Sequence, residues 1–209
     1  MAPLDEWSDA IHLIGAGGIG THVLLALIEL GAREVNVWDD DIVAPHNRPT
    51  QFVYSKSDIG KPKVAGMQRF VESQGYDTVI KPHYKRVDAK TKLQGVVISG
   101  VDTMASRRNI WQALKYNPFV PLYIDGRVGD AYVHVMTIEP CNPTHIERYE
   151  STFFDDTAAT DLSCSTRENP HSALAVAQMV SMNFSLFLQG EDVKDAVYRN
   201  LRHEAASVQ

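Results

Sequence analysis

The segment from Gly15 to Gly20, which reads GAGGIG, has the glycine spacing of a nucleotide-binding turn. In such a turn the first glycine permits a tight bend, the second lets the backbone approach a phosphate, and the third allows a helix to pack closely on a strand. Amide groups at the start of the following helix then point at the phosphates. Asp39, nineteen residues after Gly20, closes the next strand and can accept hydrogen bonds from ribose hydroxyls. We therefore expect a nucleotide site formed by Gly15, Gly17, Gly18, Gly20 and Asp39.

The elements that would position these residues alternate between apolar, strand-like runs and helical patterns. Buried strands of a parallel sheet read as short apolar runs, and helices supply the crossovers between them. The pattern predicts a Rossmann-like, doubly wound α/β fold with a mostly parallel sheet. We expect strands at residues 11–14, 34–38, 78–81, 95–99 and 122–124, and helices at 19–30, 61–75 and 105–116.

Two parts of the chain depart from this alternation. Residues 40–58 contain polar turn clusters and two prolines, which predicts a long ordered loop over the carboxyl ends of the strands, where loops commonly carry function. After about residue 130 we expect antiparallel strands, because residues 132–138 alternate as a half-exposed strand would. Residues 139–170 read as irregular, and two C-terminal helices are expected at 172–188 and 191–206.

Composition restricts the class of protein without indicating an activity. With 209 residues, 44% of them apolar, the chain can bury one full core, and we expect a single domain over residues 1–209. The formal charge of −6 gives no global electrostatic reason to bind nucleic acid or an acidic membrane surface. Two cysteines and no signal-like stretch predict a reduced, cytoplasmic protein. The apolar segment 172–188 carries Gln178 and Asn183, so we expect a buried helix and not a membrane span.

A succession of motifs resembles the ThiF and MoeB adenylyltransferase type, which includes the adenylation domains of ubiquitin-activating enzymes. The resemblance covers about residues 9 to 140, with a weaker echo in the C-terminal helices. A plain dinucleotide-binding fold has no reason to carry Asp-Ile-Gly-x-Pro-Lys where this chain does. The matching residues are the glycine run, Asp39-Asp40-Asp41, Asn47, Gln51, Asp58-Ile59-Gly60-Lys61-Pro62-Lys63 and Asp102.

The resemblance implies a reaction in which a carboxylate attacks the α-phosphate of ATP and gives an acyl-adenylate and pyrophosphate. The carboxylate is usually the C-terminal glycine of a ubiquitin-like protein, and thioester or sulfur transfer can follow. Such an attack concentrates negative charge on the phosphates, so cations and aimed donors matter more than a base. ATP and Mg²⁺ are the expected cofactors. A small ubiquitin-like protein or peptide is the expected partner, and a homodimer is the expected assembly.

By similarity, Lys63 would neutralise phosphate charge, and Asp102 would hold Mg²⁺ at the carboxyl end of a predicted strand. Both residues have a simpler alternative: Lys63 could be a solvated helix residue, and Asp102 could cap the helix that follows it. The further implied roles are the ribose contact for Asp39, the metal or loop order for Asp41, and the lining of the nucleotide pocket for Asn47 and Gln51. Asp40 is left out because it would face away from its neighbours along an extended backbone.

The chain departs from the family pattern at an arginine. Where the family reads Asn-x-x-Arg-Gln, this chain has Thr50, and a guanidinium appears at Arg48 instead. Since threonine cannot neutralise phosphate, either Arg48, Arg107 or Arg127 substitutes, or the reaction is weakened or lost. No arginine precedes Arg33, so an N-terminal arginine donated to a dimer partner is not expected.

The cysteines form a second departure. Cys141 and Cys164 are too few for the four-sulfur zinc site of many relatives, and we predict no structural zinc. Cys164 falls near the cysteine that receives the activated group in some relatives. A thiolate there would be a competent nucleophile if it lay beside the adenylate and a cation such as Arg167, although an isolated loop cysteine is more often a bystander.

Arg127 follows a predicted strand and would face the same end of the sheet as Asp102. It is a candidate contact for a partner's carboxylate or for the triphosphate, unless it only pairs with Asp125 or Asp130. The strand from Tyr132 could receive an extended C-terminal tail or a second subunit.

Three functions follow from this sequence. The first is an ATP- and Mg²⁺-dependent adenylyltransferase, with Lys63, Asp102, Arg48, Arg127 and Cys164 as its candidate catalytic residues. The second is a catalytically degenerate relative that binds a nucleotide or a ubiquitin-like partner without adenylation. The third is an NAD-dependent oxidoreductase, which would use the glycine turn and Asp39 for a nicotinamide cofactor.

Overall fold

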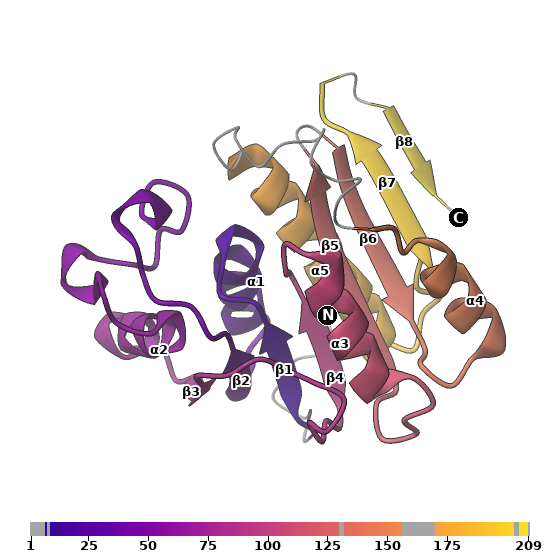
Figure 1. Ribbon diagram of the computed structural model, residues 1–209, viewed down its shortest axis with the longest axis horizontal. Helices are drawn as coiled ribbons and strands as arrows, with labels where there is room; N and C mark the ends of the chain where they lie inside the picture. Colours follow the sequence, from indigo (N-terminus) through magenta and orange to yellow (C-terminus); the bar gives the residue numbers. More distant parts are fainter. Residues whose placement is uncertain (1–6, 8, 130–131, 156–169, 203–204, 209) are drawn as a thin grey trace.

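One mixed β-sheet runs through the molecule (Figure 1). The computed structural model describes residues 7, 9–129, 132–155, 170–202 and 205–208. Within them, eight strands form the sheet in the order β3-β2-β1-β4-β5-β6-β7-β8. The strands are β1 (Ile11–Ile14), β2 (Glu34–Trp38), β3 (Val79–His83), β4 (Val96–Ser99), β5 (Leu122–Gly129), β6 (Tyr132–Ile138), β7 (Ala196–Asn200) and β8 (Ala205–Val208).

The first five strands pair in parallel, and β6, β7 and β8 add on antiparallel. Strand order reverses at β1, because the chain passes from β1 outward to β2 and β3 and then returns to the other side of β1 as β4. In open sheets of this kind ligands bind outside the carboxyl ends of the strands at such a switch point. The predicted mostly parallel, doubly wound α/β fold with antiparallel strands after residue 130 is therefore confirmed.

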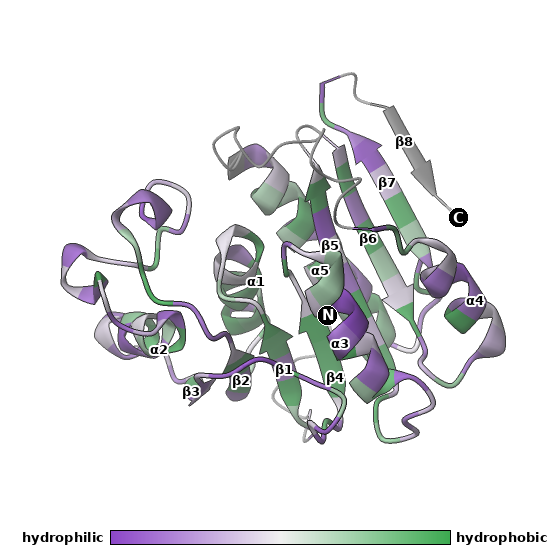
Figure 2. Ribbon diagram, viewed as in Figure 1, coloured by the Kyte–Doolittle hydropathy of each residue, from purple (hydrophilic) through white to green (hydrophobic). Residues whose placement is uncertain are grey.

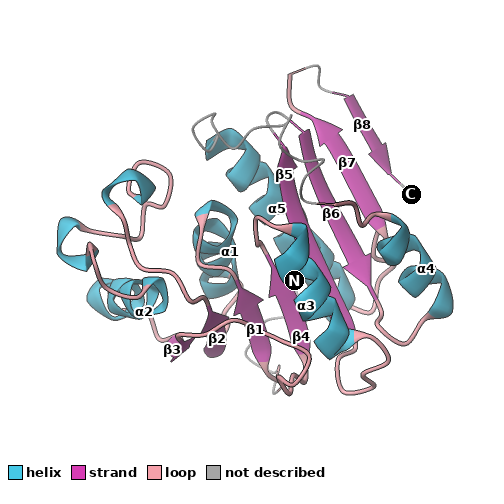
Figure 3. Ribbon diagram, in the orientation of Figure 1, coloured by secondary structure: helices cyan, strands magenta, loops and turns pink. Residues whose placement is uncertain are grey.

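Helices cover both faces of the sheet (Figure 3). One face of the sheet packs against α1, α2 and α5, and the other face packs against α3 and α4. The sheet therefore lies between two apolar cores. Figure 2 shows the central strands as the most apolar part of the molecule. The helices are α1 (Gly18–Glu29), α2 (Lys63–Gln74), α3 (Met104–Leu114), α4 (Pro143–Ser151) and α5 (Pro170–Leu188).

The prediction of a second C-terminal helix at 191–206 is wrong, because this part of the chain forms β7 and β8. Strand β6 has one side free after pairing with β5, and β7 fills it, with Val197 opposite Val135 and Tyr198 opposite His134. This pairing satisfies the backbone groups on the free side of β6, which would otherwise form an open sheet edge. The local pattern of apolar residues does not indicate pairing with a distant strand.

Helix α4 lies inside the segment that we expected to be irregular. Its start has a readable signal, since Asn142 caps the helix by accepting a hydrogen bond from the Thr144 amide at 3.0 Å, and Pro143 follows at the first helical position. The other predicted elements agree with the structure to within a few residues, except that β5 extends five residues beyond Ile124.

Helix α5 contains the stretch His171–Leu188, which is long and apolar enough to cross a membrane by length and composition alone. A core helix of a soluble protein passes the same test. Here Val176, Val180 and Phe184 are buried in the core shared with α1 and the sheet. This burial supports the expectation of a buried helix.

Candidate functional site

The glycine turn joins β1 to α1 at the switch point of the sheet. Gly15 has a φ of +101°, which favours glycine, and a Cβ on Gly20 would lie 1.9 Å from the carbonyl oxygen of Gly15. A Cβ on Gly17, in contrast, would meet no described atom within 4 Å. None of the described side chains caps α1, so its first amides can receive an anion placed over Gly17.

Asp39 holds the glycine turn against the end of β2. Its Oδ2 accepts a hydrogen bond from the Ala16 amide at 2.7 Å, and its Oδ1 accepts one from the Asp41 amide at 2.8 Å. Burial raises the pKa of Asp39, and the hydrogen bonds from these amides and the charge of Lys63 offset part of the shift. The carboxylate thus orders the turn, and its ribose contact stays a prediction.

Tyr54 is a residue of this site that the sequence reasoning missed. Its hydroxyl donates to the carbonyl oxygen of Ala16 at 2.6 Å, and its ring is buried. A Cβ on Gly66 of α2 would lie 2.7 Å from this ring. Tyrosine is rare in polar loops, so a tyrosine within the 40–58 loop is the sequence signal that could have identified this residue.

Lys63 lies at the start of α2 and points at the end of β2. Its Nζ donates to Asp41 Oδ2 at 2.8 Å, and its amide donates to the Asp41 carbonyl at 2.9 Å. The Lys63 side chain is 9% exposed, whereas that of Asp41 is 60% exposed. The alternative that Lys63 is a solvated helix residue is therefore wrong.

The residues before Lys63 build the loop that aims it. Asp58 is buried and accepts hydrogen bonds from the Ser55 amide and from Arg69 Nε, each at 2.7 Å. Burial would raise the pKa of Asp58, but these hydrogen bonds and the charge of Arg69 bring it below its usual value. Gly60 has a φ of +84°, and its amide donates to the carbonyl of Val43 at 2.9 Å. The motif therefore fixes the direction from which Lys63 enters the site.

Asp102 follows β4, is exposed, and precedes the cap of α3. The cap is Thr103, whose side chain accepts a hydrogen bond from the Ser106 amide at 3.1 Å. The alternative that Asp102 caps this helix is therefore wrong, and its carboxylate is available for another role. Just before it, a Cβ on Gly100 would lie 2.6 Å from Ile19 Cγ2, so this glycine permits β4 to meet α1 closely.

Asp39, Asp40 and Asp41 place carboxylate oxygens within 4.8 Å of one another. The expectation that Asp40 faces away from its neighbours is therefore wrong, because Asp39 Oδ1 accepts a hydrogen bond from the Asp41 amide and turns the chain after β2. Such oxygens suit a hard cation such as Mg²⁺, although exposed acidic groups of this kind are common without one.

A second overlooked residue is Arg86, which follows β3. Its Nε donates to Asp40 Oδ2 at 2.7 Å. This hydrogen bond and the charges of Asp40, Asp41 and Asp102 raise the pKa of Arg86. The structure thus brings Lys63, Arg86 and these carboxylates to one edge of the sheet.

Asn47 and Gln51, which were predicted to line the nucleotide pocket, are buried within the 40–58 loop, and Asn47 stabilises the loop backbone. Asn47 is buried at the end of a short 3-10 turn (Pro45–Asn47), and its Oδ1 accepts a hydrogen bond from the Ala44 amide at 2.7 Å. Gln51 is also buried, at 2% exposure. Arg48 is half-buried, and its Nε has no hydrogen-bond partner in the part of the chain that the structure describes. Nucleotide contacts of these residues stay predictions.

Arg107 and Arg127 both turn to Asp125, which is fully buried on β5. Arg127 Nε donates to Asp125 Oδ2 at 2.6 Å, and Arg107 Nε lies 3.3 Å from both oxygens. Ser99 and Tyr149 donate to the same carboxylate at 2.8 and 3.1 Å. Burial alone would raise the pKa of Asp125, but the two guanidinium charges and the hydrogen bonds lower it.

This network decides between the uses proposed for the two arginines. Arg107 is 4% exposed and also donates to backbone carbonyls, so it is not placed to substitute for the arginine absent at Thr50. The alternative that Arg127 pairs with Asp125 is confirmed. One of its nitrogens, Nη2, is buried without a partner among the described residues, so a contact of Arg127 with a ligand stays a prediction.

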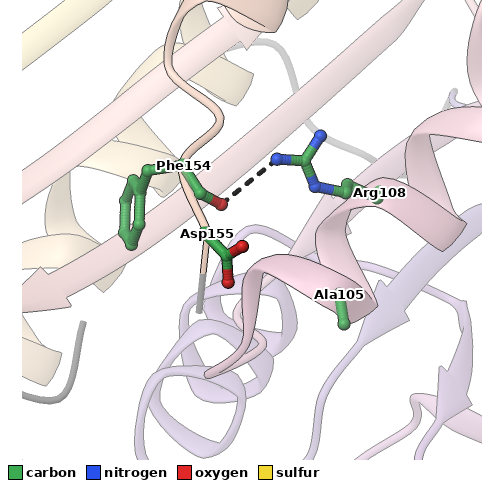
Figure 4. Close-up of a pocket in the computed structure, with 4 residues that line it drawn as sticks. All are labelled: Ala105, Arg108, Phe154 and Asp155. Carbon is green, nitrogen blue, oxygen red and sulfur yellow. Dashed lines mark hydrogen bonds between the residues drawn. The ribbon is translucent and has the colours of Figure 1, made fainter. Parts of the chain in front are cut away.

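A pocket opens beside the amino end of α3 (Figure 4). It is lined by Ala105, Arg108, Phe154 and Asp155, and Arg108 Nη2 donates to the Phe154 carbonyl at 3.1 Å. Ala105 follows Asp102 by three residues, so the pocket lies near the carboxyl end of β4. The sequence does not indicate this pocket, because Phe154 and Asp155 come from a segment without a motif.

The two cysteines lie in the segments that follow β6. Cys141 is an exposed free thiol between β6 and α4. Cys164 and Arg167 lie outside the described residues, so the predicted nucleophile and its cation stay predictions.

The sequence is similar to a known family and to several of its characterised members. The model of the ThiF family matches residues 7–203. The chain is 32% identical over 146 residues to the NEDD8-activating enzyme E1 catalytic subunit of Schizosaccharomyces pombe, which covers 65% of this chain and 33% of that protein. It is also 32% identical over 97 residues to the SAMP-activating enzyme E1 of Haloferax volcanii, covering 46% and 35%.

Among solved structures, the fold is similar to that of E. coli MccB. The complex of MccB with AMPCPP and MccA superimposes with a TM-score of 0.72 at 14% identity, covering 97% of this chain and 63% of that one. The complex of MccB with ATP gives a TM-score of 0.70 at 16% identity, covering 96% and 62%. The chain thus spans about a third of the length of these two curated relatives and less than two thirds of the MccB chain.

Proposed function

Because the chain belongs to the ThiF family, we propose that it is an ATP- and Mg²⁺-dependent adenylyltransferase. Its substrate would be the C-terminal carboxylate of a ubiquitin-like protein or peptide, activated as an acyl-adenylate. The observation that carries the proposal is the position of Lys63 and Asp102 on either side of the glycine turn at the switch point. A phosphate chain on the open amides of α1 would lie between them.

Each group has a separate task in this reaction. The backbone amides at the start of α1, next to Gly17, and the ammonium of Lys63 would stabilise the charge that builds on the α-phosphate during attack. Asp39 would hold the ribose while it orders the turn. Asp102, with Asp41, would hold Mg²⁺, which supplies further positive charge to the phosphates. The open space over Gly17 and the oxygen-only donor set fit these two cofactors.

The acceptor would approach from the side of α3. The pocket lined by Arg108 and Asp155 lies at the amino end of α3, which begins two residues after Asp102. The exposed Tyr132 begins a strand whose outer end could contact a docked protein. By their names, two relatives activate NEDD8 and SAMP, and MccB has been crystallised with MccA. These names support a small protein or peptide as the substrate, and a homodimer is the assembly that we expect.

Exchange of radiolabelled pyrophosphate into ATP tests the proposal. Reversible adenylate formation predicts exchange that requires Mg²⁺ and the carboxylate substrate, so candidate substrates are small proteins and peptides with a free C-terminus. Exchange with none of a panel of such substrates, together with no measurable ATP binding, would contradict the proposal.

A degenerate, non-catalytic relative is the second candidate, and the arginines favour it. Thr50 cannot neutralise phosphate, and Arg107 and Arg127 are held by Asp125. ATP binding without pyrophosphate exchange in the presence of a bound partner would support this candidate. An oxidoreductase would instead show larger thermal stabilisation by NAD than by ATP.

A further inference from the structure

We propose that Arg86 is a phosphate-binding residue of the nucleotide site, held by Asp40 until the nucleotide arrives. This inference rests on the proposed nucleotide binding and adds a residue to which neither a motif nor the sequence reasoning assigned a role.

Arg86 lies at the carboxyl edge of the sheet, close to the glycine turn. Its guanidinium is bound to Asp40, which follows β2, at 2.7 Å. Asp40 and Asp39 place carboxylate oxygens within 4.8 Å of each other, and Asp39 accepts a hydrogen bond from the Ala16 amide of the glycine turn at 2.7 Å. Two short contacts therefore separate the guanidinium from the turn where a phosphate would bind.

The charges at this edge favour a further cation. The carboxylates of Asp39, Asp40 and Asp41 gather there, and Asp102 follows β4 at the same edge of the sheet. A nucleoside triphosphate brings further negative charge, and a metal ion neutralises only part of it. Among the described residues, Lys63 and Arg86 are the cations that pair with the clustered carboxylates.

Arg86 can change partners more easily than the other arginines of the region. The side chains of Arg86 and Asp40 are 69% and 41% exposed, so solvent screens their attraction and the pair is weak. The side chains of Arg107 and Arg127 are only 5% and 11% exposed, and both form ion pairs with the fully buried Asp125. Removing either from that carboxylate would leave a buried charge uncompensated, which is strongly unfavourable.

A phosphate is a better partner for Arg86 than Asp40. The planar guanidinium can donate two parallel hydrogen bonds to phosphate oxygens, as it can to a carboxylate, and a phosphate chain carries more charge. The expected exchange breaks the Nε contact with Asp40 and forms contacts with the nucleotide. Asp40 would then compete with the nucleotide for Arg86.

Isothermal titration calorimetry with Mg-ATP, AMP and adenosine tests the inference. For Arg86→Ala we expect ATP affinity to fall about tenfold or more, AMP affinity to fall less, and adenosine affinity to stay unchanged. Arg86→Lys should retain part of the ATP affinity, because the charge remains but the paired donors are lost. Asp40→Asn should leave ATP affinity unchanged or raise it, because the competing carboxylate is removed.

Arg33→Ala is the matched control. It removes the same charge from an exposed residue that precedes β2, at the opposite edge of the sheet, and should leave all three affinities unchanged. Equal ATP affinity in Arg86→Ala and the unmodified protein would overturn the inference while nucleotide binding stands. Loss of adenosine binding together with ATP binding in Arg86→Ala would also overturn it. Absence of nucleotide binding by the unmodified protein would overturn both the inference and the proposed function.

Discussion

At the scale of single residues, Lys63 combines burial with a charge that is only partly satisfied. Its Nζ contacts Asp41 at 2.8 Å, but Asp41 is 60% exposed and can turn to solvent or a metal ion. An ammonium held in this way keeps its position while its partner changes. Lys63 is therefore suited to contact phosphate oxygens as charge develops on them.

We predict that Lys63→Ala lowers the rate of pyrophosphate exchange about 10²- to 10³-fold, the usual effect of removing one group that stabilises transition-state charge. The free energy of unfolding should change by about 1 kcal/mol or less, because the ion pair is screened on the Asp41 side. Lys61→Ala, which removes an exposed lysine two residues earlier, is the control for charge. Full exchange activity in Lys63→Ala would remove Lys63 from the mechanism.

Asp102 differs from Asp39 in having no structural task that the structure shows. We predict that Asp102→Ala abolishes exchange, because the Mg²⁺-binding carboxylate is lost, while the melting temperature stays within about 1–2 °C, as for an exposed substitution. Raising the Mg²⁺ concentration should restore exchange in part if Asp102 binds the metal. A variant that exchanges normally at low Mg²⁺ would disprove this role.

At the scale of elements, the turn between β1 and α1 uses two of its glycines for different purposes. Gly20 allows the helix to approach the turn, because a Cβ there would overlap the Gly15 carbonyl at 1.9 Å. Gly17 leaves open space over the first amides of α1. The glycine spacing in the sequence predicts both properties, since each depends on local backbone geometry.

We predict that Gly20→Ala destabilises the fold by about 3 kcal/mol or more, the upper end of overpacking costs, because the obstructing atom is backbone. Gly17→Ala should cost less than about 1 kcal/mol and instead weaken ATP binding, because the new methyl group occupies the space expected for a phosphate. Chemical denaturation measures the first effect and calorimetry the second. The assignment of the two glycines would be wrong if Gly17→Ala bound ATP as well as the unmodified protein.

At the scale of the whole molecule, the antiparallel half of the sheet buries groups that titrate. The pKa of His134 is lowered to about 4, mainly by burial and next by the charge of Arg127. The ring of His134 stacks on Tyr198 with centroids 3.8 Å apart. An unfolded histidine binds a proton below about pH 6.5, whereas His134 in the folded state stays neutral to about pH 4. Stability from this group is therefore present above pH 6.5 and is lost as the pH falls towards 4.

We predict that stability falls between pH 7 and pH 5 and that His134→Phe reduces this fall by about 2 kcal/mol, the amount that linkage assigns to one such group at pH 5. Phenylalanine keeps the stacking on Tyr198 and removes the titration. Urea denaturation of both proteins at pH 7 and pH 5 measures the difference. An identical fall in the two proteins would show that His134 does not contribute to the pH dependence.

The sequence alone determined what depends on local geometry and on spacing. The glycine turn and the apolar strands β1, β2 and β4 can be predicted because turn chemistry and periodicity act over a few residues. The role of Lys63 was implied by the motif that it shares with a family. Tertiary structure decided what depends on a distant partner. Residues 196–200 form β7 because β6 has an unpaired side, Arg107 and Arg127 pair with the buried Asp125, and Arg86, after β3, meets Asp40 at the end of the neighbouring β2. Such contacts join residues that are adjacent only after folding, so no local pattern contains them.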